Sequence, residues 1–230
     1  MSLPLKSKLY DLLGRDHMAS DCFIQSLTHR SAHHMHNERM EFLGDSVLGL
    51  VVTKTLYHHM PKATEGYLSR LRASLVNEST LADIANELKL GDFLRLGAGE
   101  LKSGGFRRKS ILSDTLEAVI ASVYLEQGMD AAEDFVLKIY THRFDQLPTE
   151  ESLKDPKSRL QELLQSRKLE IPRYELVDTS GDDHRQIFTA ECEIPSLSIK
   201  TKGVSSSRRK AEQQAALNAY ESVIECFKKK

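Results

Sequence analysis

The hydrophobic periodicity of this chain changes near residue 150, and that change constrains the fold more than any other feature of the sequence. Before it, apolar residues recur at helical spacing; after it, short segments alternate apolar with polar residues, as half-buried strands do. The sequence therefore predicts a multi-domain protein, with an all-α domain followed by a small α+β domain. A polar stretch with a proline, at 148–154, is the expected linker, which places the two domains at 1–147 and 155–227.

The expected elements follow from these patterns. In the first half, helical spacing predicts helices over 38–60, 68–88, 111–127 and 131–144. Ser79, Thr80 and Ser110 are expected caps, and the glycine-rich stretch 96–106 is an expected loop. The second half predicts the order α-β-β-β-α, with helices on one face of an antiparallel sheet: 155–167, 174–177, 188–194, 197–202 and 208–227.

The composition is that of an ordinary globular protein. The 230 residues are 40% hydrophobic and 28% charged, which excludes collagen-like and disordered classes. No apolar run is long enough to span a membrane, and no secretory signal is evident, so we expect no membrane partner. The cysteines, Cys22, Cys192 and Cys226, fit neither a zinc motif nor a disulfide framework, which predicts a reducing, cytoplasmic location.

The net charge of −1 conceals an asymmetry between the two halves. Residues 154–230 carry 15 Lys and Arg against 12 Asp and Glu, whereas residues 1–153 carry 17 against 21. Six of the basic residues in the second half form two runs, at 208–210 and 228–230. A basic run alone is more often a solvated face, but this distribution indicates a basic binding module joined to an acidic domain.

Carboxylates in the helical half follow a pattern that suits a metal centre. Glu38, Glu41 and Asp45 fall on one face of a helix. Asp114 and Glu117 share a face of another. Acids on helices are usually just exposed, but these interrupt apolar stretches, and inward-facing carboxylates need a cation. Oxygen ligands suit Mg²⁺ or Mn²⁺, either of which could assist hydrolysis of a phosphodiester.

Three further features surround these acids. Gly44 indicates that another backbone approaches closely, and Glu65 is a sixth candidate carboxylate, expected in a loop. Four histidines form a cluster for which a solvated or structural role is favoured over zinc ligation: His29, His33, His34 and His36.

The segment 37–48, Asn-Glu-Arg-Met-Glu-Phe-Leu-Gly-Asp-Ser-Val-Leu, resembles the signature of the ribonuclease III family of double-strand-specific RNA endonucleases. Further family motifs follow in the same order at 28–31, 65–66, 104–106 and 114–118. The second half resembles the double-stranded RNA-binding domain of the bacterial enzymes, so the resemblance covers nearly the whole chain. Met40, where leucine is more common, is the only change inside the signature.

This resemblance implies roles for the acids. Residues matching Glu41, Asp45, Asp114 and Glu117 bind a divalent metal, Mg²⁺ with Mn²⁺ as a possible substitute. Those matching Asp45 and Glu117 are the most closely tied to catalysis. Glu38 and Glu65 match residues that support the site less directly. All six acids are present, so nothing in the sequence indicates an inactive nuclease.

The resemblance also implies the reaction and the assembly. The family hydrolyses phosphodiester bonds of double-stranded RNA, leaving 5′-phosphate and 3′-hydroxyl ends with short 3′ overhangs. Expected roles are the processing of ribosomal RNA precursors and messenger RNA. Cutting both strands takes two sites, which the family provides by a homodimer, and Phe42 is the candidate residue for reaching into the partner.

Three groups in the second half are candidate contacts with a duplex, and each matches a contact region of the RNA-binding family. Gln161 and Gln165 can bond 2′-hydroxyl groups, and His184 can enter the next minor groove. Three basic residues open the last helix, where the helix dipole also favours phosphate: Arg208, Arg209 and Lys210. Three residues depart from the family pattern and could weaken duplex binding: Ser205, Asp182 and Asp183.

Two other functions remain open from the residues alone. One is a regulator that holds RNA duplexes without cutting them, against which the six intact acids argue. The other is an unrelated helical metal phosphohydrolase acting on small substrates, which would need no basic α-β-β-β-α module.

Overall fold

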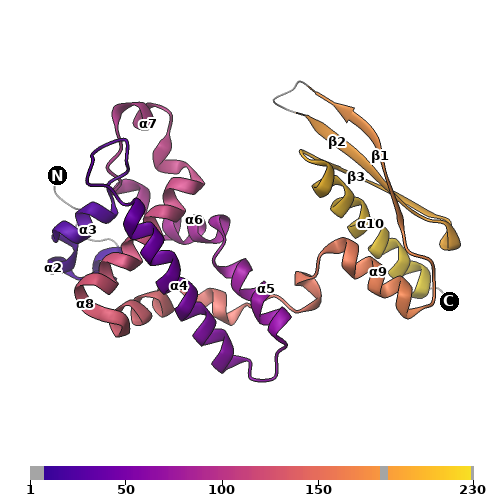
Figure 1. The fold of residues 1–230 in the computed structure, drawn as a ribbon, viewed down its shortest axis with the longest axis horizontal. Coiled ribbons are helices and arrows are strands. Elements are labelled where there is room, and N and C mark those ends of the chain that lie inside the picture. Colours follow the sequence, from indigo (N-terminus) through magenta and orange to yellow (C-terminus); the bar gives the residue numbers. More distant parts are fainter. Residues whose placement is uncertain (1–7, 182–185, 229–230) are drawn as a thin grey trace. The chain divides into compact units, whose positions relative to one another are not determined.

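The structure, a computed structural model, describes residues 8–181 and 186–228. The chain divides after Pro148 into a helical unit and a second unit that holds the three-stranded sheet (Figure 1). The predicted fold class, all-α followed by α+β, is therefore confirmed. None of the described helices is both long and apolar enough to cross a membrane.

The helical unit begins with three short helices, α1 (Lys8–Leu13), α2 (Arg15–Met18) and α3 (Asp21–Ser26). Longer helices follow, namely α4 (Glu38–His59), α5 (Glu65–Leu75) and α6 (Glu78–Glu87). A short α7 (Ala98–Lys102) precedes the long α8 (Lys109–Asp145), and 3₁₀ turns lie at Leu90–Asp92 and Gly105–Arg107.

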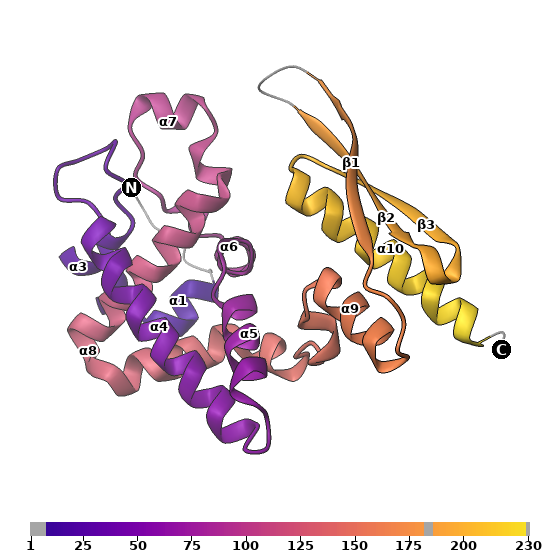
Figure 2. The same cartoon turned by 45° about the vertical axis from the view of Figure 1, so that its right-hand side comes forward.

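Helix α8 is the buried centre of this unit. From Ile111 to Val123 nearly every side chain is buried, because apolar residues occur all round this part of the helix. Helix α4 packs along it, as Figures 1 and 2 both show. At Gly128 the backbone adopts a φ of 86° and a ψ of −178°, which glycine tolerates, so α8 kinks there. The predicted break after residue 127 is confirmed, although both segments belong to one kinked helix.

The predicted single helix over 68–88 is wrong, because Asn77 interrupts it. Its side chain accepts a hydrogen bond of 2.9 Å from the backbone N–H of Thr80 and so caps α6. Ser79 and Thr80, the expected caps, therefore lie inside the first turn of α6.

Two further local predictions are also wrong. Helix α8 begins at Lys109, so Ser110 lies within its first turn and does not cap it. The stretch 96–106 is not a continuous loop, since it contains α7 and part of the second 3₁₀ turn.

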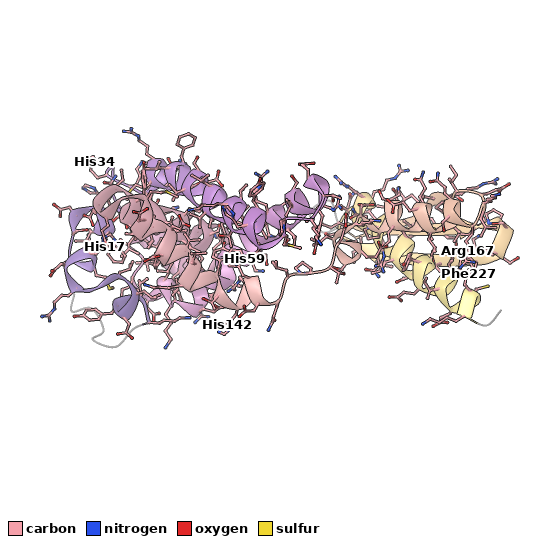
Figure 3. The ribbon with its side chains drawn as sticks, turned by 90° about the horizontal axis from the view of Figure 1, so that it is seen from below. His17, His34, His59, His142, Arg167 and Phe227 are labelled. Carbon is pink, nitrogen blue, oxygen red and sulfur yellow. The ribbon has the colours of Figure 1, made fainter. Side chains whose placement is uncertain are left out.

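Buried His17 attaches the N-terminal helices to α8. Its Nε2 lies 3.0 Å from the hydroxyl oxygen of Ser122, and its Nδ1 lies 2.5 Å from a carboxylate oxygen of Glu126. Burial lowers the pKa of His17, although the charge of Glu126 opposes this shift. Figure 3 shows His17 among the helices of this unit, where it fixes α2 against α8.

The second unit has the predicted order of elements. It contains α9 (Pro156–Ser166), β1 (Arg173–Ser180), β2 (Ile187–Ile194), β3 (Ile199–Ser205) and α10 (Arg208–Lys228), with 3₁₀ turns at Glu151–Leu153 and Pro195–Leu197. The strands form an antiparallel sheet in the order β1-β2-β3. Strand β1 is longer than the predicted 174–177, because its polar end from Asp178 to Ser180 still pairs with β2.

Helices α9 and α10 share one apolar core with the sheet. Its buried members come from both helices and from β2: Leu160, Leu164, Cys192, Ile194, Ala215, Ala216, Ala219 and Val223. A Cβ at Gly203 would overlap the carbonyl oxygen of Ala211, so β3 lies directly against α10. At the far end of the two helices, the Arg167 guanidinium lies 4.9 Å from the centre of the Phe227 ring (Figure 3).

Candidate metal centre and nucleic-acid interface

Gly44 determines how closely α4 approaches α8. A Cβ atom at this position would lie far inside van der Waals contact with the carbonyl oxygen of Glu117. The close backbone approach predicted at Gly44 is therefore confirmed. Because the two backbones meet here, Glu41 on α4 comes beside Asp114 and Glu117, which are more than seventy residues further along the chain.

The carboxylates of Glu41, Asp114 and Glu117 converge. One oxygen from each lies within 4.8 Å of those of the other two. Glu117 is only 9% exposed, and the other two are half-buried. Burial, reinforced by the charges of Asp45, Asp114 and Glu41, raises the pKa of Glu117 to about 8. Burial is also the largest cause of the raised pKa values of Glu41 and Asp114.

This cluster fits a divalent cation. Across the part of the chain that the structure describes, no lysine or arginine forms an ion pair with any of the three carboxylates. Three carboxylates that repel one another in a half-buried position lack a compensating charge. Carboxylate oxygens are the ligands that hard ions such as Mg²⁺ prefer, and such an ion would supply that charge.

The other three predicted acids lie outside the group of three. Asp45 is exposed, but its charge raises the pKa values of both Glu41 and Glu117, so it lies near the cluster. Glu38 pairs with Arg30 at 3.1 Å. Glu65 begins α5 instead of lying in the expected loop, and its carboxylate accepts a hydrogen bond of 2.6 Å from Ser69.

Three residues that act on Asp114 were not identified as site residues from the sequence: Ser113, Glu78 and His29. Burial and the charge of Glu78 raise the pKa of Asp114, whereas a hydrogen bond from Ser113 and the charge of His29 lower it. The sequence signal for His29 was its place in the family motif at 28–31, but it was grouped with three neighbouring histidines as solvated or structural.

The outer face of α4 exposes large apolar side chains. Phe42 is 78% exposed, Leu50 57% and Tyr57 68%. At 100° per residue, the three fall on one side of the helix. A stripe of this kind is typical of a surface that another protein covers.

The predicted duplex contacts in the second unit lie on the surface. Gln161 and Gln165 are exposed on α9, and three basic residues are exposed in the first turn of α10: Arg208, Arg209 and Lys210. Lys157 Nζ, 2.8 Å from a carboxylate oxygen of Glu212, joins the beginnings of the two helices.

Of the three residues that depart from the family pattern, the structure describes only Ser205. Ser205 ends β3 and pairs with Phe188. His184, Asp182 and Asp183 lie outside the described residues.

Comparison with known proteins assigns both units. Residues 20–144 match the family model Ribonuclease-III-like, and residues 156–223 match the Double-stranded RNA binding motif. The chain belongs to the ribonuclease III family. It is thus an endoribonuclease of double-stranded RNA, and the alternative of a small-substrate phosphohydrolase is excluded. Members of this family depend on divalent metal.

Named relatives cover nearly the whole chain. "Ribonuclease 3" of Buchnera aphidicola subsp. Baizongia pistaciae is 52% identical, over 92% of this chain and 94% of the relative. "Ribonuclease 3" of Shewanella baltica is 50% identical, over 98% of this chain and 99% of the relative.

Solved structures resemble the helical unit. The crystal structure of the nuclease domain of ribonuclease III from Campylobacter jejuni is 44% identical, with a TM-score of 0.57, over 61% of this chain and 97% of that one. A second structure of that domain, described as showing structural flexibility in a region involved in dimer formation, is 42% identical, with a TM-score of 0.55, over 60% of this chain and 99% of that one.

Proposed function

We propose that this member of the ribonuclease III family cuts double-stranded RNA at the carboxylate cluster of α4 and α8, with Mg²⁺ as the ion and Mn²⁺ as a substitute. The observation that carries the proposal is the convergence of Glu41, Asp114 and Glu117 without a neutralising cation from the described chain. The products would have 5′-phosphate and 3′-hydroxyl ends with short 3′ overhangs. Ribosomal RNA precursors and messenger RNA are the proposed substrates.

Each part of the chain has a proposed role. Glu41, Asp45, Asp114 and Glu117 would hold the ion, with Asp45 and Glu117 most closely tied to catalysis. When bound, the ion supplies positive charge at the scissile phosphate and lowers the pKa of water. Buried Glu117 is a ligand that the fold holds in place, whereas exposed Asp45 can also contact water and substrate. Glu38 and Glu65 would support the site from its edge.

Each of the two units has its own proposed activity. We assign cutting to residues 1–147 and duplex binding to residues 155–227, with 148–154 as the linker; the division after Pro148 and the two family matches support this. A cytoplasmic location is also proposed. The three cysteines form no disulfide bond, and free cysteines are typical of a reducing compartment.

A homodimer is the proposed assembly, because cutting both strands takes two sites. The exposed stripe of Phe42, Leu50 and Tyr57 supports an interface on α4. Phe42→Asp should place an unpaired charge in that interface twice per dimer, so sedimentation should show monomers and cleavage should fall. Ile171→Asp, at a 58% exposed position of the second unit, should remain dimeric. A fully dimeric, active Phe42→Asp variant would contradict this interface.

The start of α10 should bind phosphates without reading bases. Replacing Arg208, Arg209 and Lys210 by alanine should weaken duplex binding for all sequences and reduce the slope of log K against log salt by about two to three units. The matched control is Lys200→Ala with Lys202→Ala. These lysines lie on the sheet face opposite α10, because Thr201 between them bonds the carbonyl of Ala215. An unchanged slope in the triple variant would refute the assignment.

Analysis of product ends tests the proposed reaction. An end-labelled RNA duplex should yield, with Mg²⁺, fragments that a ligase joins without prior phosphorylation and whose 3′ ends overhang. Mn²⁺ should replace Mg²⁺, and a single-stranded RNA of the same sequence should survive. Fragments with 3′-phosphate ends would refute the proposed chemistry, and cleavage of the single strand would refute the specificity.

A further inference from the structure

His29 is held in one orientation by Ser31. Its Nδ1 lies 2.8 Å from Oγ of Ser31 and accepts a hydrogen bond of 3.2 Å from the backbone N–H of the same residue. A ring nitrogen that accepts an N–H carries no proton, so the ring proton lies on Nε2. Among the described residues, no hydrogen bond partner of Nε2 is found. His29 therefore presents an N–H donor that is free for a ligand.

The residues around His29 are themselves fixed. The backbone N–H of Gly97 donates to Oγ of Ser31 at 2.9 Å, and a Cβ at Gly97 would overlap the carbonyl oxygen of Ser31. The backbone N–H of His29 donates to the carbonyl of Arg95 at 3.0 Å, and that of Arg95 donates to Leu27 at 2.9 Å. Segment 95–97 thus holds the loop on both sides of the imidazole, which reduces the entropy lost when the ring binds a ligand.

Backbone hydrogen bonds connect the loop that carries His29 to the helix that carries Glu41. The carbonyl of Thr28 accepts a hydrogen bond of 3.0 Å from the backbone of Asn37, and the carbonyl of Asn37 accepts one of 2.8 Å from Glu41. Two backbone hydrogen bonds therefore connect Thr28, the neighbour of His29, through Asn37 to Glu41 of the cluster. The ring is also close enough to Asp114 for a positive charge on it to lower the pKa of that carboxyl.

We propose that Nε2–H of His29 donates a hydrogen bond to a non-bridging oxygen of the phosphodiester that is cut, and that Ser31 and Gly97 position the ring for this contact. The inference rests on the proposed function and deepens it. Metal ligation by His29 is disfavoured, because Nδ1 is occupied and Nε2 carries the proton. An anionic phosphate placed against the carboxylate cluster would be stabilised by a hydrogen-bond donor at its edge, and Nε2–H of His29 provides one.

Substitutions at His29 and a neighbouring histidine test the contact. His29→Ala should slow single-turnover cleavage by about 10- to 100-fold, because the transition state would lose one hydrogen bond to a charged group. His29→Gln, which keeps an N–H donor of similar reach, should recover part of the rate. His34→Ala is the matched control, since His34 stacks on His33 in the same loop and should be dispensable. Duplex affinity and the rise in melting temperature with Mg²⁺ should stay at wild-type values in all three variants.

A double-mutant cycle tests the positioning role of Ser31. Ser31→Ala should slow cleavage, but His29→Ala with Ser31→Ala should be no slower than His29→Ala alone, because Ser31 acts through the ring. If His29→Ala cuts within twofold of wild type, or loses the rise in melting temperature with Mg²⁺, the proposed contact is wrong. A wild type that does not cut duplex RNA would instead refute the proposed function, and with it this inference.

Discussion

Glu117→Gln should stabilise the metal-free protein at pH 8 and should remove the stabilisation that Mg²⁺ provides. Glu117 is buried beside the charges of Asp45, Asp114 and Glu41, so its ionised form is unfavourable in the absence of a cation. Glutamine keeps the shape and loses the charge. Without metal the variant should therefore be more stable by about 2–4 kcal/mol, which corresponds to about 5–10 °C in melting temperature for the helical unit.

The effect should depend on pH in a defined direction. The pKa of the Glu117 carboxyl lies at its ordinary 4.5 in the unfolded chain and at about 8 in the fold. Between these values the folded state keeps a proton that the unfolded state has lost, so stability should fall as pH rises from 4.5 to 8. Glutamine does not titrate, whereas the wild-type carboxyl is mostly protonated in both states near pH 4. The difference in stability between Glu117→Gln and the wild type should therefore vanish there.

Calorimetry in chelator and in Mg²⁺ checks both statements. Mg²⁺ should raise the melting temperature of the wild type, since it binds only the folded state, and should raise that of Glu117→Gln much less. Glu38→Gln is the matched control, because Glu38 pairs with Arg30 outside the group of three and should leave the Mg²⁺ effect largely intact. A Glu117→Gln variant less stable than wild type at pH 8 without metal would contradict the assignment.

Gly44→Ala should be among the most damaging small substitutions in the chain. The added methyl group would overlap the Glu117 carbonyl, which is backbone and cannot rotate away, so α4 and α8 must separate. Such overpacking should cost about 3 kcal/mol. Because the contact also brings Glu41 to Glu117, cleavage by the folded fraction should fall about 100-fold.

Gly49→Ala is the matched control for this prediction. Gly49 lies on the same helix, and no atom lies within 4 Å of a Cβ built there. Alanine should therefore stabilise α4 by about 0.5–1 kcal/mol through helix propensity. Urea unfolding of both variants gives the comparison, and a Gly44→Ala variant as stable as Gly49→Ala would show that the helices are not in close contact.

Local patterns were sufficient for the fold class but not for every helix boundary. The change from helical to alternating periodicity is a property of neighbouring residues, so it predicts the helical unit and the α+β unit correctly. The break predicted after residue 127 is a kink at Gly128 within one helix. The start of α6 is harder, because several adjacent polar residues could each cap a helix, and only the folded backbone shows that Asn77 meets the free N–H of Thr80.

The candidate site could also be predicted only in part, because it depends on contacts between residues far apart in the chain. Helical geometry places Glu38, Glu41 and Asp45 on one face, but only the position of α8 decides that Glu41 joins the group of three. His29 was grouped with His33, His34 and His36 from the sequence, and only the folded structure shows that segment 95–97 fixes the loop at His29. Contacts between residues far apart in the chain leave no local signal, although Gly44 pointed to one of them.

Cleavage of a labelled RNA duplex by wild type and Glu117→Gln, each with Mg²⁺ and with chelator, tests whether a metal held between α4 and α8 is required for cutting. The wild type should cut only with the metal. Glu117→Gln should bind the duplex with wild-type affinity, through the second unit, and should cut it about 1,000-fold more slowly or not at all. Cleavage by Glu117→Gln at near the wild-type rate in Mg²⁺, or by the wild type in chelator, would contradict the assignment of catalysis to a metal held between α4 and α8.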